Sequence, residues 1–143
     1  MYKIPVSVLV VIHTVDLEVL LLERADHPGY WQSVTGSQDP GETLLDTAMR
    51  EIAEETGLNT ADYQLTDWHV ENRYEIYEEW RWRYGPDVRF NTEHVFGLRL
   101  PSAMPVTIST REHLNYIWLP WQQAAKKVFS SSNAEAIMSL PAR

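Results

Sequence analysis

The sequence lacks cysteine entirely and is poor in basic residues. Because none of its 143 residues is cysteine, disulfide scaffolds, iron–sulfur clusters, cysteine zinc sites and thiol nucleophiles are excluded. Its 12 Lys and Arg residues are outnumbered by 20 Asp and Glu residues, which gives a formal net charge of −8. A chain of this charge repels a phosphate backbone unless a bound cation or a basic patch intervenes, so we expect no nucleic-acid partner.

Long apolar runs are also missing. The longest uninterrupted one covers residues 8–12, whereas about 20 residues are needed to cross a bilayer. Residues 1–5 contain neither the basic segment nor the apolar helix of an export signal. We therefore expect no membrane partner and a cytoplasmic location. The length and the 44% content of hydrophobic residues predict a single domain, residues 1–143, with one substantial core.

Apolar patterning predicts a mixture of strands and helices. Strands are expected at residues 6–12, 19–22, 65–70, 94–100 and 114–119, which are apolar stretches bounded by polar residues or proline. The first two flank a turn-like segment, so we expect them to pair.

Two helices are expected. The first has an apolar stripe at helical spacing, formed by Leu45, Ala48, Met49 and Ile52. Thr43 and Asp46 form a capping box at its start, and Gly57 is suited to end it. The second is expected to begin at Ser132, which has Glu135 three residues later.

The first helix concentrates negative charge. Glu51 precedes Glu54 by three residues and Glu55 by four, so all three carboxylates are expected on one edge of the helix. Like charges at this spacing cost about 0.2–0.5 kcal/mol per pair, and Arg50 cannot neutralise three of them. Two interpretations follow: a solvated acidic face, or a site for a hard divalent cation such as Mg²⁺ or Mn²⁺, which oxygen ligands favour.

A longer motif decides between them. The pattern G-x5-E-x7-R-E-U-x-E-E-x-G-U, in which U is a bulky aliphatic residue, is matched at every fixed position from Gly36 through Glu42 to the segment 50–58. A P-loop is excluded because Glu42, rather than Lys followed by Ser or Thr, comes after Gly41. The motif is the Nudix box, and the chain resembles the Nudix hydrolase family.

This resemblance implies an α/β (α+β) fold, an α/β/α sandwich with a mixed sheet, in which residues 36–58 form a loop-helix-loop. It implies hydrolysis of a nucleoside diphosphate linked to another group, with Mg²⁺ as cofactor and Mn²⁺ as the alternative. By resemblance, Glu51, Glu54 and Glu55 hold the catalytic cations, or one of them acts on water instead. We assign Glu51 and Glu55 to the metal and Glu54 to catalysis. Arg50, the second catalytic residue, holds the carboxylates in place and pairs with Glu42.

Outside the box, the chain is similar to the Nudix hydrolases that act on 7,8-dihydroneopterin triphosphate. The segments that carry this similarity are residues 5–7, 31–37, 83–86, 91–93, 112–114 and 132–133. The similarity implies a third metal ligand, Glu112. It implies substrate contacts at Lys3, Arg24, Thr35, Tyr74, Glu75, Ile76, Tyr77 and Ser130.

The implied reaction yields dihydroneopterin monophosphate and pyrophosphate, a step of folate biosynthesis, and the partner is a small-molecule triphosphate. The alternative is a Nudix pyrophosphatase for deoxynucleoside triphosphates or damaged nucleotides. A metal-binding or interaction module without catalysis is disfavoured because no acid of the box is missing. The sequence leaves the oligomeric state open.

One further segment has two interpretations. Trp80, Trp82 and Tyr84 alternate with Arg81 and Arg83, which predicts a strand with one aromatic and one cationic face. The aromatic face is suited either to stacking a pterin ring or to core and subunit packing. Among the histidines, only His113, beside Glu112, is a functional candidate.

Overall fold

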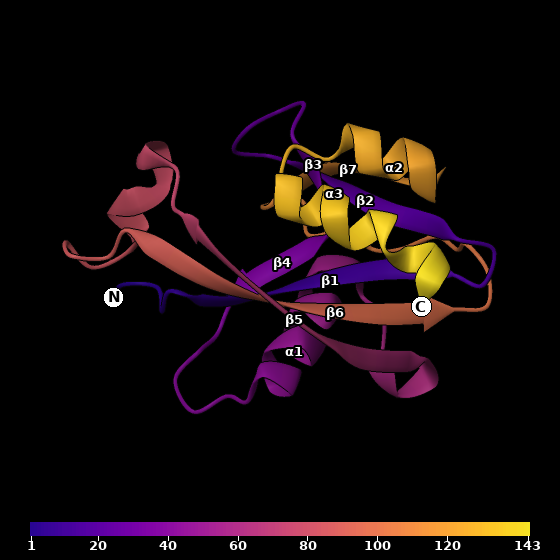
Figure 1. Ribbon diagram of the computed structural model, residues 1–143, viewed down its shortest axis with the longest axis horizontal. Helices are drawn as coiled ribbons and strands as arrows, with labels where there is room; N and C mark the ends of the chain where they lie inside the picture. The colour runs from indigo at the N-terminus through magenta and orange to yellow at the C-terminus, as the bar shows by residue number, and fades with distance from the viewer.

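The computed structural model describes residues 1–143, which form a mixed β-sheet with helices against both faces (Figure 1). The strands are β1 (Val6–Thr14), β2 (Glu18–Arg24), β3 (Trp31–Gln32), β4 (Val34–Ser37), β5 (Gln64–Glu75), β6 (Phe90–Leu100) and β7 (His113–Pro120). The helices are α1 (Leu44–Thr56), α2 (Trp121–Lys127) and α3 (Ser131–Met138), with short 3₁₀ helices η1 (Thr60–Asp62), η2 (Glu78–Arg83) and η3 (Leu140–Ala142). The predicted fold class and all five predicted strands are confirmed. None of the helices is long and apolar enough to cross a membrane.

The sheet divides beside β1. β1 pairs along its length with β6, in parallel, and along its first half with β4. It shares only one paired position with β2, His13 with Val19, and β2 then pairs with β3 and β7. One part of the sheet therefore contains β4, β1, β6 and β5, and the other contains β3, β2 and β7. The space between the two parts is where the candidate site lies.

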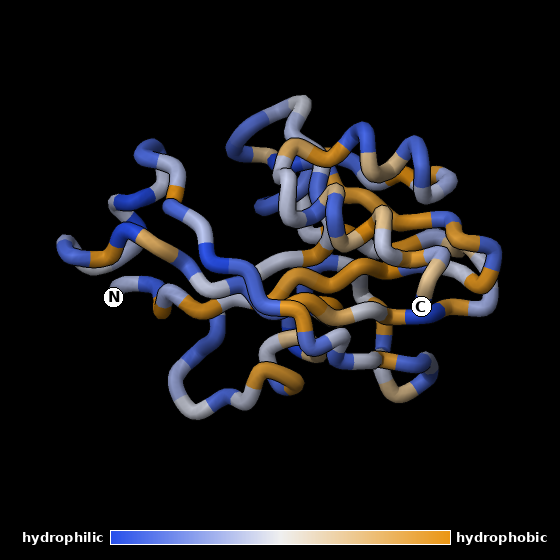
Figure 2. The backbone as a smooth tube through the Cα atoms, viewed as in Figure 1, coloured by the Kyte–Doolittle hydropathy of each residue, from blue (hydrophilic) through white to orange (hydrophobic).

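The core consists of two apolar clusters, one on each side of β1. Val8, Val10 and Ile12 belong to the cluster that includes residues of α1, whereas Leu9 and Val11 belong to the cluster that includes residues of α2 and α3. Because successive side chains of a strand point to opposite faces, a strand buried on both faces is apolar without interruption. Figure 2 shows this hydrophobic band along the central strands.

Local signals fix both ends of α1. The Thr43 hydroxyl accepts a hydrogen bond from the Asp46 backbone N–H, and the Asp46 carboxylate accepts one from the Thr43 N–H, so the predicted capping box is present. Gly57 ends the helix with φ 74°, a left-handed conformation that glycine adopts without strain.

The buried face of α1 differs from the predicted apolar stripe. Ala48 and Ile52 are buried, but Leu45 and Met49 are 48% and 43% exposed. The buried face includes Glu51 and Glu55 instead. Compared with the orientation that the apolar stripe predicts, the helix is rotated about its axis so that its acidic edge faces the interior. Hydrophobicity alone does not predict this rotation.

Two other predictions were wrong in detail. Ser130, rather than Ser132, caps α3 by accepting a hydrogen bond from the Asn133 backbone N–H. Residues 78–83 form the 3₁₀ helix η2 rather than a strand, and Trp82 is 74% exposed. The period-two alternation in this segment therefore does not reflect pairing in the sheet. No apolar pattern in the sequence predicts α2.

Candidate active site

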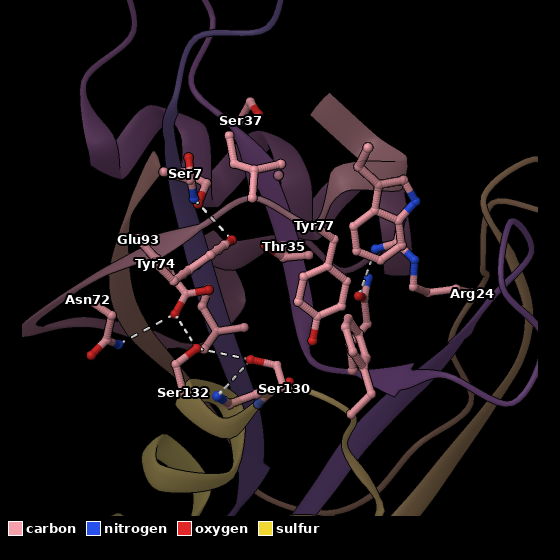
Figure 3. Close-up of a pocket in the computed structure, with 18 of the residues that line it drawn as sticks. Ser7, Arg24, Thr35, Ser37, Asn72, Tyr74, Tyr77, Glu93, Ser130 and Ser132 are labelled. Atoms are coloured by element: carbon pink, nitrogen blue, oxygen red, sulfur yellow. Dashed lines mark hydrogen bonds between the residues drawn. The ribbon is translucent and has the colours of Figure 1, made fainter. Parts of the chain in front are cut away.

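A cavity of about 640 Å³ opens between the two parts of the sheet. Its lining includes β-strand residues from both parts and residues of η2, of the turn before β7 and of the start of α3. Every substrate contact predicted from the sequence lines it, as do two of the predicted metal ligands: Lys3, Arg24, Thr35, Tyr74, Glu75, Ile76, Tyr77, Ser130, Glu55 and Glu112. Figure 3 shows several of these side chains directed toward one another. The other three predicted residues, Arg50, Glu51 and Glu54, lie on α1 outside this lining.

The glycine of the motif makes room for an acid of the motif. Gly36 lies on β4, opposite Val8 of β1. A Cβ atom built on Gly36 would overlap all three atoms of the Glu51 carboxylate group. Glycine at position 36 therefore allows the Glu51 carboxylate of α1 to lie against β4. Glu51 is only 8% exposed in this position.

Glu55 is the least satisfied polar side chain of the site. It is 1% exposed, and neither of its carboxylate oxygens has a hydrogen-bond partner. Burial, together with the neighbouring Glu51 and Glu112, raises the pKa of Glu55 well above its ordinary value. Burial also raises the pKa of Glu51, against the opposing effect of Arg50. A buried carboxylate without a partner is costly, so its retention needs a reason.

His113 does not offset this charge. Its Nε2 atom lies 3.5 Å from Glu55 Oε1. Burial, assisted by the positive charge of Arg24, lowers the pKa of His113 to about 4. At neutral pH the imidazole is therefore uncharged, and its buried Nδ1 atom also lacks a partner.

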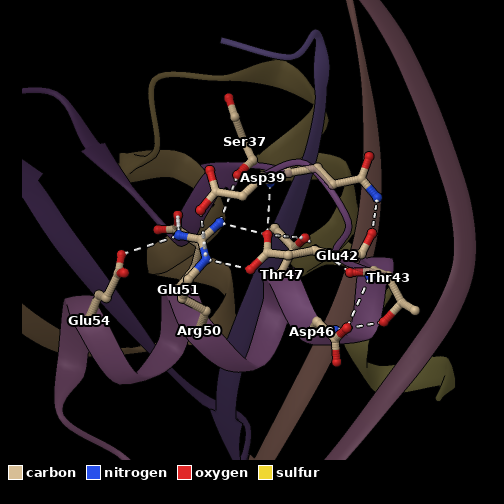
Figure 4. Close-up of polar contacts among 10 residues, drawn as sticks. Ser37, Asp39, Glu42, Thr43, Asp46, Thr47, Arg50, Glu51 and Glu54 are labelled. Carbon is tan, nitrogen blue, oxygen red and sulfur yellow. Dashed lines mark hydrogen bonds and ion pairs between the residues drawn. The ribbon is translucent and has the colours of Figure 1, made fainter. Parts of the chain in front are cut away.

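Arg50 of α1 forms hydrogen bonds with acidic residues of the helix itself and of the loop before it (Figure 4). Its Nε and Nη2 atoms donate to the two oxygens of Glu42 at 2.7 and 2.9 Å, and Nη2 also donates to the Ser37 carbonyl at 2.9 Å. Its Nη1 atom donates to Glu51 Oε1 at 2.7 Å and to Glu54 Oε2 at 3.4 Å. The expected pairing of Glu42 with Arg50 is therefore present, and it lowers the pKa of Glu42 to about 2.

These acids suit a hard divalent cation. In this structure no three of the chain's His, Asp and Glu side chains are arranged closely enough to hold a metal ion together. The donor set nevertheless consists of carboxylate oxygens, and the orphaned oxygens of Glu55 lie beside Glu51 and near the pocket residue Glu112. Oxygen donors with unbalanced negative charge are what Mg²⁺ and Mn²⁺ require.

The cationic side of the cavity is already paired in part. Arg24 donates to both oxygens of Asp26 at 2.7 Å and to Gln32 Oε1 at 2.9 Å. Arg83 Nη2 lies 3.0 Å from Asp26 Oδ2, one of these two oxygens. Hydrogen bonds from Arg24, in the first place, lower the pKa of Asp26 to about 2. The N-terminal segment reaches this region through the Lys3 backbone N–H, which donates to the Arg83 carbonyl at 2.8 Å.

The aromatic residues of η2 do not offer the free stacking face that one interpretation of the sequence required. The Arg24 guanidinium lies 4.4 Å from the centroid of the Trp80 ring, and Tyr77 stacks on Trp80 at 5.2 Å and 8°. Trp82 does not line the cavity. Trp80 is therefore packed within an aromatic cluster that itself lines the cavity.

The sequence did not identify a second polar group in the cavity, which consists of Ser7, Asn72, Asn91, Glu93 and Ser132. Residues 91–93 and 132–133 contributed to the family resemblance, but no role was assigned to them. The sequence offered one signal for this group: an acidic residue, Glu93, at the start of an otherwise apolar strand, β6. In the structure this residue is buried.

Comparisons with known proteins identify the family of this chain. The sequence matches the NUDIX domain family over residues 3–140. It is 45% identical over 139 residues to dihydroneopterin triphosphate diphosphatase of Escherichia coli K12, an alignment that covers 95% of this chain and 91% of that protein. The protein of the same name from Haemophilus influenzae is 38% identical, with 95% and 87% covered. A solved structure of the E. coli dihydroneopterin triphosphate pyrophosphohydrolase superposes with a TM-score of 0.91 at 44% identity, covering 96% of this chain and 94% of that chain. The chain therefore belongs to the Nudix family.

Proposed function

We propose that this protein hydrolyses 7,8-dihydroneopterin triphosphate to dihydroneopterin monophosphate and pyrophosphate, with Mg²⁺ or Mn²⁺ as cofactor. The observation that carries the proposal is the 45% identity, over nearly the whole length, to an enzyme named for this substrate. The cavity supports it, because its lining combines the carboxylates of Glu55 and Glu112 with polar side chains suited to a heterocycle.

Glu51, Glu55 and Glu112 would hold the cation. Nudix proteins generally use a divalent metal, which when bound neutralises phosphate charge and activates water. Arg50 acts as a positioning residue, because its hydrogen bond fixes the Glu51 carboxylate. Lys3 and Arg24 add positive charge along the triphosphate.

In the proposed reaction, water attacks the α-phosphorus, and the bond from this phosphorus to the oxygen that bridges to the β-phosphorus breaks. Pyrophosphate leaves with the bonding electron pair. Glu54 accepts the proton of the water, for which its exposed carboxylate is accessible. Thr35, Ser130 and the segment Tyr74, Glu75, Ile76 and Tyr77 would bind the remainder of the substrate.

The test is incubation with Mg²⁺ and a panel of pterin and nucleoside triphosphates in ¹⁸O-labelled water. We expect pyrophosphate as the first phosphate product from dihydroneopterin triphosphate, with the label in the monophosphate. Orthophosphate as the first product would contradict the reaction. An equal or higher kcat/KM for a deoxynucleoside triphosphate would leave the Nudix chemistry but favour the nucleotide pyrophosphatase alternative.

Glu112→Gln is expected to lower kcat about tenfold or more while changing KM by less. The reason is that a residue that completes the catalytic site contributes more in the transition state than in the bound ground state. Steady-state kinetics at saturating Mg²⁺ measures this, and Glu71→Gln, which removes an exposed carboxylate outside the cavity, is the control. A rise in KM with kcat intact would make Glu112 a binding residue instead.

A further inference from the structure

A row of polar side chains crosses the sheet at the end of the cavity formed by β1, β5 and β6. Ser7 of β1 pairs in register with Glu93 of β6, and Glu93 pairs with Asn72 of β5. Ser7 and Glu93 are only 5% and 4% exposed, yet both line the cavity. Figure 3 shows Glu93 between Asn72 and Ser132.

Glu93 is a buried carboxylate without a cationic partner, since it forms no ion pair with any Lys, Arg or His. Its Oε1 atom accepts hydrogen bonds from Ser132 Oγ at 2.8 Å and from Asn72 Nδ2 at 3.4 Å. No hydrogen bond from the chain reaches Oε2. An ionised carboxylate offers about four acceptor positions, so about two remain toward the cavity.

A purely structural role does not account for these features. Ser132 belongs to α3, so its hydrogen bond ties this helix to the sheet. A neutral amide could accept that hydrogen bond without the cost of a buried charge. Burial raises the pKa of Glu93, which reflects this cost. The remaining acceptor positions are therefore available to a group that enters the cavity.

We propose that Glu93 is a specificity-determining residue that accepts two adjacent N–H groups of the substrate's ring. A pterin presents this edge as its ring N3–H and 2-amino group. The inference rests on the proposed function. It specifies which part of the substrate, the donor edge of the ring, binds at this end of the cavity. Because an ionised carboxylate only accepts hydrogen bonds, it pairs with a donor–donor edge and repels an edge that contains an acceptor.

The same chemistry predicts which nucleotides compete. Guanine carries an equivalent donor pair, its N1–H and 2-amino group. Adenine places the acceptor N1 beside its amino group, and uracil flanks its N–H with carbonyl oxygens. We therefore expect guanine nucleotides to be accepted better than adenine or uracil nucleotides.

The first test measures binding of unphosphorylated 7,8-dihydroneopterin in the presence of a chelator, so that neither triphosphate nor metal contributes. Glu93→Gln, which turns one acceptor into a donor, is expected to weaken binding about 10- to 100-fold. The control Glu71→Gln, on the neighbouring strand β5 outside the cavity, is expected to bind like the wild type. Equal affinity of the Glu93→Gln variant and the wild type would overturn the proposal.

The second test compares the kinetics of the wild type and the variants with Mg²⁺. Two preferences are measured: kcat/KM for dihydroneopterin triphosphate divided by that for ATP, and kcat/KM for GTP divided by that for ATP. In Glu93→Gln each ratio is expected to fall about tenfold or more, through KM rather than kcat. Ser132→Ala removes the tie to α3 but keeps the carboxylate, so it is expected to keep most of both ratios. If Ser132→Ala lowers the ratios as much as Glu93→Gln does, Glu93 has only a structural role.

Two further measurements keep the outcomes separate. Thermal unfolding shows whether Glu93→Gln folds. If it does not fold, Glu93→Asp replaces it, because aspartate retains an acceptor-only side chain. Glu93→Asp is expected to bind dihydroneopterin more weakly but to keep the preference for GTP over ATP. Loss of that preference in Glu93→Asp would contradict the proposal. Failure of the wild type to cleave dihydroneopterin triphosphate would refute the proposed function, whereas binding of dihydroneopterin without metal still decides the role of Glu93.

Discussion

Glu55→Gln is expected to reduce kcat at saturating Mg²⁺ by at least about a hundredfold. The substitution preserves the size of the side chain but removes the anionic charge that a divalent cation requires. Glu51→Gln is expected to have an effect of the same order, because Glu51 is the adjacent carboxylate and contacts Arg50. Near-normal turnover in both variants would contradict the assignment of these residues to the metal site.

The same variant is expected to have the opposite effect on the stability of the protein without metal. The raised pKa of Glu55 means that the folded protein binds its proton more tightly than the unfolded chain does. Stability is therefore lost as the pH rises above about 4.5, the ordinary value, toward the higher pKa of the folded state. Removing the ionisable group relieves this loss. The like-charge repulsion between Glu51 and Glu55 alone costs about 0.2–0.5 kcal/mol, so in chelator at pH 8 Glu55→Gln is expected to be more stable by at least about this amount.

Denaturant unfolding with and without Mg²⁺ separates the two effects. Mg²⁺ is expected to raise the unfolding midpoint of the wild type, because a ligand that binds only the folded state stabilises it. The rise is expected to be much smaller for Glu55→Gln. An equal rise in both proteins would place the cation elsewhere, whatever the kinetics showed.

The features predicted correctly from the sequence are those encoded by neighbouring residues. The capping box of Thr43 and Asp46 and the left-handed Gly57 follow from local backbone chemistry, which does not depend on the rest of the fold. The strand β1 follows from an apolar run that only a doubly buried strand or helix can accommodate. The pattern of acids in the motif likewise depends on spacing along one helix.

The features that were missed depend on contacts between distant segments. The apolar stripe did not predict that α1 buries Glu51 and Glu55 while it exposes Leu45 and Met49, because that rotation depends on β4 and the cavity. Glu93 is in contact with Ser132, 39 residues away. No sequence pattern around either residue indicates this pairing. It arises because α3 packs against the sheet.

Gly36→Ala is expected to lower kcat/KM by about a hundredfold, although the change adds only a single methyl group. The added Cβ would occupy the space of the Glu51 carboxylate group, so this group must move away from the side of β4. Movement of a proposed metal ligand is expected to disrupt the site, and overpacking costs about 1–3 kcal/mol of stability. Gly85→Ala is the control, because its Cβ would meet the nearest side-chain atom at 3.7 Å, an ordinary contact.

A double-mutant cycle tests whether the clash with Glu51 is the cause. In a Glu51→Ala background the space beside Gly36 is vacant, so Gly36→Ala is expected to cost little additional stability. The coupling free energy, measured by denaturant unfolding of the four proteins in chelator, should then account for most of the cost of Gly36→Ala alone. Additive costs would show that Gly36 is required by the backbone of β4 instead. In that case the glycine of the motif would be required by the strand rather than by the Glu51 carboxylate.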